Sequence, residues 1–204
     1  MSAYRVLRGI ANVLIKILCR AEYHGRENEP KEGAFIAYSN HTSFLDPVLT
    51  ACSVKRTLFF MAKSDLMKSR FMRVIFKLCH LVPIHRGEND LAALRKTCEI
   101  VTRGDCVGIY PQGTRIPQEK PKVEDALAGI GLMANRTKAT LLPVTICYGK
   151  KNNKPRIFRK VHVYIGKPIP YEEYSAINER PNSHEIAAYA FARVCEDFEK
   201  HNHD

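Results

Sequence analysis

The chain has 204 residues, 45% of them hydrophobic, which suffices for one well-buried domain. Its 32 Lys and Arg against 21 Asp and Glu give a net charge of +11, which favours an anionic partner: nucleic acid, an acidic protein, a phosphorylated metabolite or an anionic membrane surface. The seven cysteines include no CxxC pair, which argues against a disulfide framework or a zinc knuckle and favours a reducing cytoplasm.

The N-terminal segment, residues 4–20, is apolar but is interrupted by Arg8, Asn12 and Lys16. It therefore falls short of the roughly 20 uninterrupted apolar residues that a membrane-spanning helix needs, and it lacks the cleavage site of a secretory signal. We expect residues 1–20 to form an amphipathic helix at a membrane interface, ahead of a single domain at 21–204.

Apolar runs and helical spacing alternate along the rest of the chain. Strands are expected at 34–38, 57–61, 81–84, 106–110, 140–147 and 161–165, and helices at 48–53, 65–79, 91–102, 125–135 and 186–200. This alternation predicts an α/β domain with a largely parallel mixed sheet flanked by helices. The helix at 65–79 is basic and rich in apolar residues, so it is either an ordinary core helix with a charged outer face or a second membrane-docking element.

Polar side chains follow the carboxyl ends of three predicted strands, the edge at which open α/β sheets bind ligands. His41 and Asp46 follow the first strand, and together they can act as a general base, because a carboxylate fixes the tautomer of a neutral imidazole and stabilises the imidazolium. Arg115 follows the strand at 106–110, and Arg86 the strand at 81–84; a guanidinium binds phosphate with two parallel hydrogen bonds. Alternatively, Asp46 is only the N-cap of the helix that Pro47 begins, and the two arginines are solvated surface residues.

Four motifs in order resemble those of the 1-acyl-glycerol-3-phosphate acyltransferase (PlsC-like) family of glycerolipid acyltransferases. The first, NHxxxxD, is matched by Asn40, His41 and Asp46. The third, usually FPEGTR, is matched by residues 110–115, YPQGTR. The second ends in an arginine after a short apolar strand, as in PIHRG at 83–87, and the fourth is an apolar strand around a proline, as in LLPVTI at 141–146.

The resemblance implies transfer of a fatty acyl group from a thioester, acyl carrier protein (ACP) or acyl-CoA, to the hydroxyl of lysophosphatidic acid. It makes His41 the general base and Asp46 its orienting partner. It further implies that the acceptor is bound by a set of residues from the motifs: Asn40, Arg86, Gln112, Gly113, Thr114 and Arg115. We expect no metal and no cofactor, a membrane surface with anionic lipid as a partner, and a position on the cytoplasmic face of the cell membrane.

Two departures from the family pattern touch acceptor binding. Gln112 replaces the usual glutamate, which loses a negative charge, and 127–129 reads LAG where many relatives have a lysine pair before a glycine. Phosphate contacts could instead come from Lys63, Lys120 or Lys122. The alternative functions are therefore acyl transfer to glycerol 3-phosphate or another lysophospholipid and, with support from charge alone, a non-catalytic module that binds lipid or nucleic acid.

Overall fold

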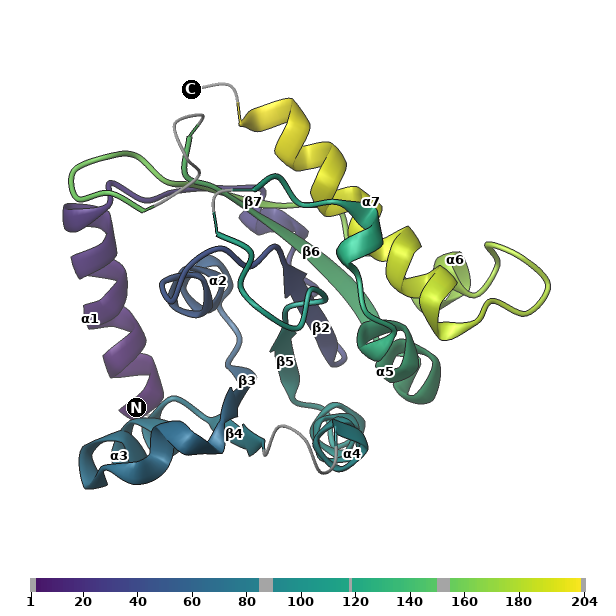
Figure 1. Cartoon of the computed structure of the whole chain (residues 1–204), viewed down its shortest axis with the longest axis horizontal. Helices are drawn as coiled ribbons and strands as arrows, with labels where there is room; N and C mark the ends of the chain where they lie inside the picture. The colour runs from purple at the N-terminus through teal and green to yellow at the C-terminus, as the bar shows by residue number, and fades with distance from the viewer. Residues whose placement is uncertain (1–2, 85–89, 118, 150–154, 203–204) are drawn as a thin grey trace.

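The protein folds into a seven-stranded sheet with helices on both faces (Figure 1). The structure is a computed structural model, and it describes residues 3–84, 90–117, 119–149 and 155–202. The strand order is β1-β7-β6-β2-β5-β3-β4. The strands are β1 (Glu22–His24), β2 (Phe35–Ser39), β3 (Leu58–Lys63), β4 (Leu81–Ile84), β5 (Cys106–Ile109), β6 (Thr140–Cys147) and β7 (His162–Ile165). The helices are α1 (Ala3–Leu18), α2 (Asp46–Ser53), α3 (Arg70–Leu78), α4 (Asp90–Thr102), α5 (Gly129–Thr137), α6 (Tyr171–Tyr174) and α7 (Ser183–His201), with short 3-10 helices η1 (Arg26–Asn28), η2 (Ser64–Lys68) and η3 (Val123–Asp125).

Strand β2 lies at the centre of the sheet, between β6 and β5, and is parallel to both. All five of its residues are buried, as expected of a continuous apolar run in a parallel strand that is covered on both faces. Of the paired strands, β6 and β7 are antiparallel and the others are parallel. The predicted α/β domain with a largely parallel mixed sheet is therefore confirmed.

Helices cover both faces of this sheet (Figure 1), and a separate hydrophobic core lies on each face. One contains Ile15 of α1 and Leu49 of α2, packed against residues of β2, β6 and β7. The other contains residues of α4, α5 and α7, among them Met133 and Phe191. With both faces covered, the strand ends and the loops beyond them are left to carry polar side chains.

Helix α1 is fixed to the domain along one face. Tyr4 and Ile15 are buried, and the guanidinium of Arg8 donates to the carbonyl oxygens of Val54 and Arg56 at 3.2 and 3.0 Å. Among the described residues, no helix is long and apolar enough to cross a bilayer.

Several element boundaries differ from those that the sequence predicts. The helix expected at 65–79 is η2 followed by α3, and the one expected at 125–135 is η3 followed by α5, which begins at Gly129. Strand β1 and helix α6 were not predicted, because three and four residues are too short for a periodic pattern. The alternative that Asp46 is only the N-cap of this helix is wrong: α2 begins at Asp46 itself, and Leu45 precedes it as the N-cap residue.

Candidate active site

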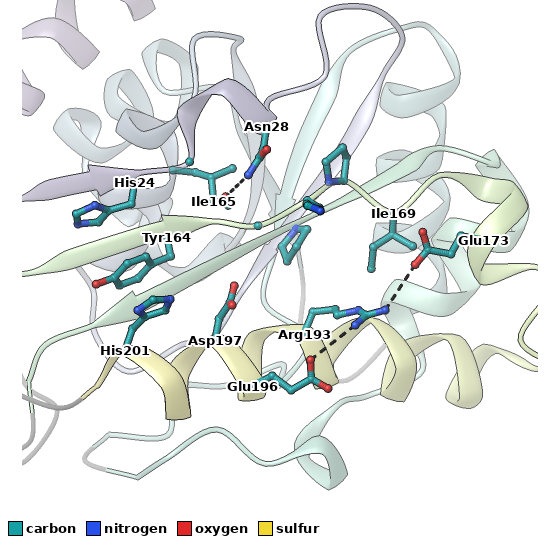
Figure 2. Close-up of a pocket in the computed structure, with 15 residues that line it drawn as sticks. His24, Asn28, Tyr164, Ile165, Ile169, Glu173, Arg193, Glu196, Asp197 and His201 are labelled. Atoms are coloured by element: carbon teal, nitrogen blue, oxygen red, sulfur yellow. Dashed lines mark hydrogen bonds and ion pairs between the residues drawn. The ribbon is translucent and has the colours of Figure 1, made fainter.

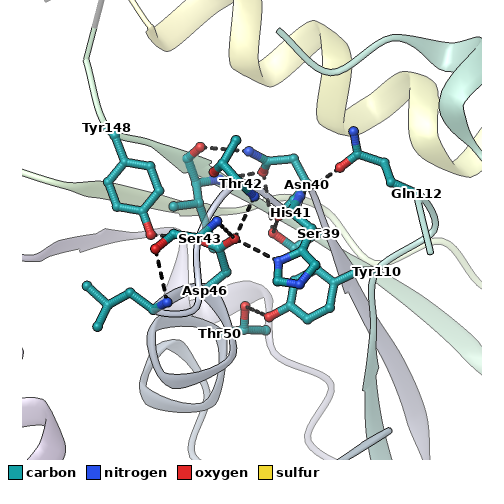
Figure 3. Close-up of polar contacts among 12 residues, drawn as sticks. Ser39, Asn40, His41, Thr42, Ser43, Asp46, Thr50, Tyr110, Gln112 and Tyr148 are labelled. Atoms are coloured by element: carbon teal, nitrogen blue, oxygen red, sulfur yellow. Dashed lines mark hydrogen bonds and ion pairs between the residues drawn. The ribbon is translucent and has the colours of Figure 1, made fainter. Parts of the chain in front are cut away.

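His41 and Asp46 are in direct contact at the end of β2. Nδ1 of His41 lies 2.8 Å from Oδ2 of Asp46, and their side chains are 17% and 0% exposed (Figure 3). Because the carboxylate accepts a hydrogen bond, Nδ1 carries the proton, and Nε2 of the neutral ring keeps its lone pair. The imidazole is thus oriented as a base, and it remains partly accessible.

The carboxylate of Asp46 is held by the chain that precedes it. Its Oδ2 accepts hydrogen bonds from the backbone N–H groups of Thr42 and Ser43, both at 2.7 Å, in addition to the bond from His41. A single oxygen therefore closes the loop between β2 and α2 and orients the imidazole. The sequence separation of five residues places His41 and Asp46 on this turn, as predicted.

Tyr148, directly after β6, donates its hydroxyl to the other oxygen of Asp46 at 2.5 Å (Figure 3). Burial, together with the adjacent Asp46 charge, raises the pKa of Tyr148 well above that of a solvated phenol. The phenol therefore keeps its proton and remains a donor. Both oxygens of this buried carboxylate are satisfied, and Tyr148 is a positioning residue that sequence reasoning missed, because it lies 102 residues from Asp46.

The ring of Tyr110 packs against the face of the His41 imidazole. The rings of Tyr110 and His41 are stacked with their centroids 4.0 Å apart and an interplanar angle of 19°. The phenol oxygen of Tyr110 lies 3.3 Å from Oγ1 of Thr50 on α2. An aromatic ring at the start of the third motif thus has a physical role, because it fixes the plane in which Nε2 points.

Gln112 connects the third motif to the first. Its Oε1 accepts a hydrogen bond from the backbone N–H of His41 at 2.7 Å, and the carbonyl oxygen of His41 accepts one from the N–H of Ile116 at 2.8 Å. The amide nitrogen of Gln112 points to Oδ2 of Asp125 at 3.4 Å. Gln112 is only 6% exposed, so we assign it to holding the His41 loop and not to the acceptor contact that the resemblance implied.

Asn40 also has an internal role. Its amide nitrogen donates to the carbonyl oxygen of Ile146, and its Oδ1 accepts from the N–H of Ile146, both at 2.9 Å. The side chain is 1% exposed and mimics a strand partner for β6. We therefore assign Asn40, which was expected to bind substrate, to fixing the loop after β2 on the fourth motif.

The last three residues of the third motif face outward. Gly113 has φ of +66°, and its N–H closes a turn on the carbonyl oxygen of Tyr110 at 2.9 Å, so a side chain would be strained there. Thr114 and Arg115 are exposed, and the Cζ of Arg115 lies 3.4 Å from the ring centroid of Phe44, a residue of the HxxxxD turn. The structure thus brings the predicted phosphate ligand to the loop that carries His41.

Comparisons with known proteins agree with this geometry. The sequence model of the Acyltransferase family matches residues 20–147. The chain belongs to the Acyltransferase family. It is 21% identical over 188 residues to a 1-acyl-sn-glycerol-3-phosphate acyltransferase of Bacillus subtilis, with 91% of this chain and 90% of that protein covered.

Two further acyltransferases extend the likeness. A 1-acyl-sn-glycerol-3-phosphate acyltransferase of Borreliella burgdorferi is 27% identical over 124 residues, which cover 60% of this chain and 49% of that one. The crystal structure of the 1-acyl-sn-glycerophosphate acyltransferase PlsC of Thermotoga maritima superimposes with a TM-score of 0.75 at 25% identity, covering 97% of this chain and 80% of that one. The resemblance drawn from four motifs is therefore confirmed, and the chain is an acyltransferase.

The remaining candidate phosphate ligands are Arg86, Lys120 and Lys122, together with Lys63, whose side chain lies outside the described part of the structure. Arg86 falls outside the described residues, as does the rest of the second motif from residue 85. Lys120 and Lys122 are exposed just after the third motif. A cavity of about 550 Å³ lies elsewhere, over β7 and α7, and none of the predicted site residues lines it (Figure 2).

Proposed function

We propose that this chain is a 1-acyl-sn-glycerol-3-phosphate O-acyltransferase, which moves a fatty acyl group from a thioester to the sn-2 hydroxyl of lysophosphatidic acid and yields phosphatidic acid. The observation that carries the proposal is the His41–Asp46 pair, in which a buried carboxylate holds a partly accessible imidazole at 2.8 Å. The names of the acyltransferases that it resembles support this acceptor.

The pair performs the reaction without an acyl-enzyme. Nε2 of His41 takes the proton of the acceptor hydroxyl while its oxygen attacks the thioester carbonyl carbon, and Asp46 stabilises the imidazolium that forms. The tetrahedral intermediate then expels the thiolate, the C–S bond breaks, and the imidazolium returns the proton to sulfur. An ester and a free thiol are the products, and His41 ends the cycle neutral.

Arg115 binds the phosphate of the acceptor in this proposal. Its guanidinium is exposed, it has no salt-bridge partner within the described part of the chain, and it rests on the ring of Phe44. Phe44 is itself 73% exposed and lies between His41 and Asp46 in sequence. A phosphate on Arg115 and an acyl chain along Phe44 place the glycerol hydroxyl of a lysophospholipid near the imidazole.

The donor is acyl-ACP or acyl-CoA. Both are anionic, so a chain with a net charge of +11 attracts either one. Direct comparison of the two thioesters distinguishes them.

We also propose that α1 docks the enzyme on the cytoplasmic face of the cell membrane, as a peripheral protein. The face of α1 opposite Tyr4 and Ile15 carries large hydrophobic side chains that are 37–60% exposed: Val6, Leu7, Ile10, Val13, Leu14, Ile17 and Leu18. These residues recur with helical spacing, and such a stripe is suited to the boundary between headgroups and acyl chains. Val74 of α3 is also exposed, and we extend the docking proposal to this helix as a second element.

The activity is tested by incubating the purified chain with lysophosphatidic acid and each thioester in turn and identifying the lipid product by mass spectrometry. We expect phosphatidic acid with at least one donor, and its formation about 10²–10⁴-fold more slowly with the His41→Ala variant. Absence of acyl transfer from both donors, with a folded protein, would contradict the proposal.

A panel of acceptors tests the alternative substrates. Lysophosphatidic acid, glycerol 3-phosphate and a lysophospholipid with a larger headgroup are compared under the same conditions. We expect the highest kcat/KM with lysophosphatidic acid. A higher kcat/KM with another acceptor would show that the other acceptor is the substrate, and the role of His41 as the base would be unaffected.

Membrane docking is tested by flotation with vesicles that contain anionic lipid. The double variant Ile10→Ser, Ile17→Ser should lose binding, whereas Leu91→Ser, an equally exposed apolar residue on α4, should retain it. Equal binding of the two variants would remove α1 from this role.

A further inference from the structure

A second polar cluster lies on β1 and β7, at the edge of the sheet remote from β4. These two strands are parallel, with Glu22 opposite His162 and His24 opposite Tyr164. Side chains two residues apart on a strand share a face, as do residues directly opposite on its neighbour. Glu22, His24 and His162 are therefore presented together on one side of the sheet.

The three side chains converge to coordination distances. Nε2 of His24 lies 3.2 Å from Nδ1 of His162, which lies 3.5 Å from Oε2 of Glu22, and one potential ligand atom from each residue falls within a 4.8 Å group. Two ligands bound at about 2.0–2.1 Å in a tetrahedron are about 3.3 Å apart. Among the residues that the structure describes, this is the one such group of three.

We infer that Glu22, His24 and His162 form a binding site for a divalent transition-metal ion, with Zn²⁺ as the best match. Two imidazoles and one carboxylate select Zn²⁺ and its neighbours over Mg²⁺ or Ca²⁺, which prefer oxygen ligands alone. Water takes the fourth position. This site has no part in acyl transfer, and the sequence concealed it because His24 and His162 are 138 residues apart.

Neighbouring groups prepare the ligands. Lys160 binds Oε1 of Glu22 at 2.7 Å and leaves the other oxygen, Oε2, turned toward His162. The ring of Tyr164 stacks on that of His24, with centroids 4.6 Å apart and an interplanar angle of 16°. On the other side Tyr164 stacks on His201 of α7 at 4.0 Å, so that the His24 ring belongs to a stack anchored on that helix (Figure 2).

The ion would join an otherwise weakly held strand to the sheet. Strand β1 has three residues, lies at the edge and pairs with β7 alone among the described strands. It directly follows α1, so a metal bridge from Glu22 and His24 to His162 would fix the point at which that helix joins the domain. Binding to the folded chain alone stabilises it by mass action.

The test is a Zn²⁺ titration of the full-length chain, freed of any histidine tag and of bound metal, followed by calorimetry and by thermal unfolding. We expect one Zn²⁺ per chain and a rise in Tm of about 5 °C or more at a hundredfold excess over Kd. The double variant His24→Ala, His162→Ala should lose both, whereas His184→Ala, which removes an exposed histidine from the start of α7, should retain both.

Three outcomes would overturn the inference. Absence of Zn²⁺ binding to the unmodified chain would reduce the cluster to a hydrogen-bonded histidine pair. Equal binding by the double variant would place the ion on the thiols, three of which, Cys19, Cys79 and Cys195, are partly exposed. Binding without a rise in Tm would remove the bridging role. None of these measurements depends on acyl transfer.

Discussion

Replacing Gln112 with glutamate restores the residue that the third motif of the resembled family usually has at this position, and we nevertheless expect it to impair this enzyme. The Oε1 of Gln112 accepts from the backbone of His41, and a carboxylate oxygen could do the same. The difference lies at the other end of the side chain. There the amide nitrogen donates to Asp125, whereas a glutamate would present a second negative charge.

The free-energy cost of a glutamate at position 112 follows from the short distance, 3.4 Å, between the amide nitrogen of Gln112 and Oδ2 of Asp125. Two unit charges at this separation repel by about 5 kcal/mol at an effective dielectric constant of about 20. Protonating a glutamate of pKa about 4.3 at pH 7 avoids the repulsion at a cost of about 3.7 kcal/mol. Asp125 is only half-buried and can turn toward solvent, so we expect the free energy of unfolding to fall by about 1–4 kcal/mol.

The penalty should depend on pH. Repulsion raises the pKa of the introduced glutamate in the folded state above its value in the unfolded chain, so the folded state binds the extra proton more tightly. Stability relative to the unmodified chain is therefore nearly preserved below the unfolded pKa of about 4.3, and it is lost as pH rises from there to the raised folded pKa.

A double-mutant cycle isolates the effect. The variants are Gln112→Glu, Asp125→Asn and the two combined, compared by urea unfolding and by kcat with lysophosphatidic acid. We expect Gln112→Glu to lower kcat about ten- to a hundredfold, because the loop that carries His41 moves, and Asp125→Asn to restore most of it. Full stability and activity of Gln112→Glu alone, or a defect that Asp125→Asn leaves unchanged, would refute the reasoning.

Three further substitutions test individual contacts. Tyr148→Phe removes the hydroxyl donor of the buried Asp46 carboxylate, so we expect a loss of about 1–3 kcal/mol in thermal unfolding and a lower kcat; a variant as stable as the parent would count against that bond. Asn40→Ala breaks both hydrogen bonds to Ile146 and should cost about 1–3 kcal/mol by urea unfolding, while unaltered unfolding would make Asn40 a candidate substrate ligand again. Arg115→Ala should raise KM for lysophosphatidic acid about ten- to a hundredfold and leave transfer to a phosphate-free monoacylglycerol unaffected, and an equal loss with both acceptors would exclude a phosphate contact.

The sequence predicted the elements that carry a strong pattern. Strand β2 is one example, because a five-residue apolar run with glycine before it and polar residues after it has few other interpretations. Strand β1 was missed, because Glu22–His24 has no apolar run and is held by its pairing with β7. The start of α2 was placed two residues late, because the hydrogen bonds that fix Asp46 come from the preceding turn.

The candidate site likewise has contacts that the sequence predicts and contacts that it does not. His41 and Asp46 are five residues apart, so local spacing was enough to pair them. Contacts between distant segments, such as Gln112 with His41 and Tyr148 with Asp46, depend on which strands are adjacent in the sheet, and motif spacing carries no such information. For this reason, Gln112 and Asn40 were assigned to the substrate, whereas the structure places both inside.

The most direct measurement of the central claim is single-turnover acyl transfer to lysophosphatidic acid by His41→Ala, with urea unfolding of the same preparation. With His41 as the general base held by Asp46, the rate should fall by about 10²–10⁴-fold, while the protein stays folded and loses no more than about 1–3 kcal/mol of unfolding free energy relative to the His184→Ala control, since one donor to Asp46 is removed. A rate within about threefold of the unmodified enzyme, in a folded protein, would contradict the account.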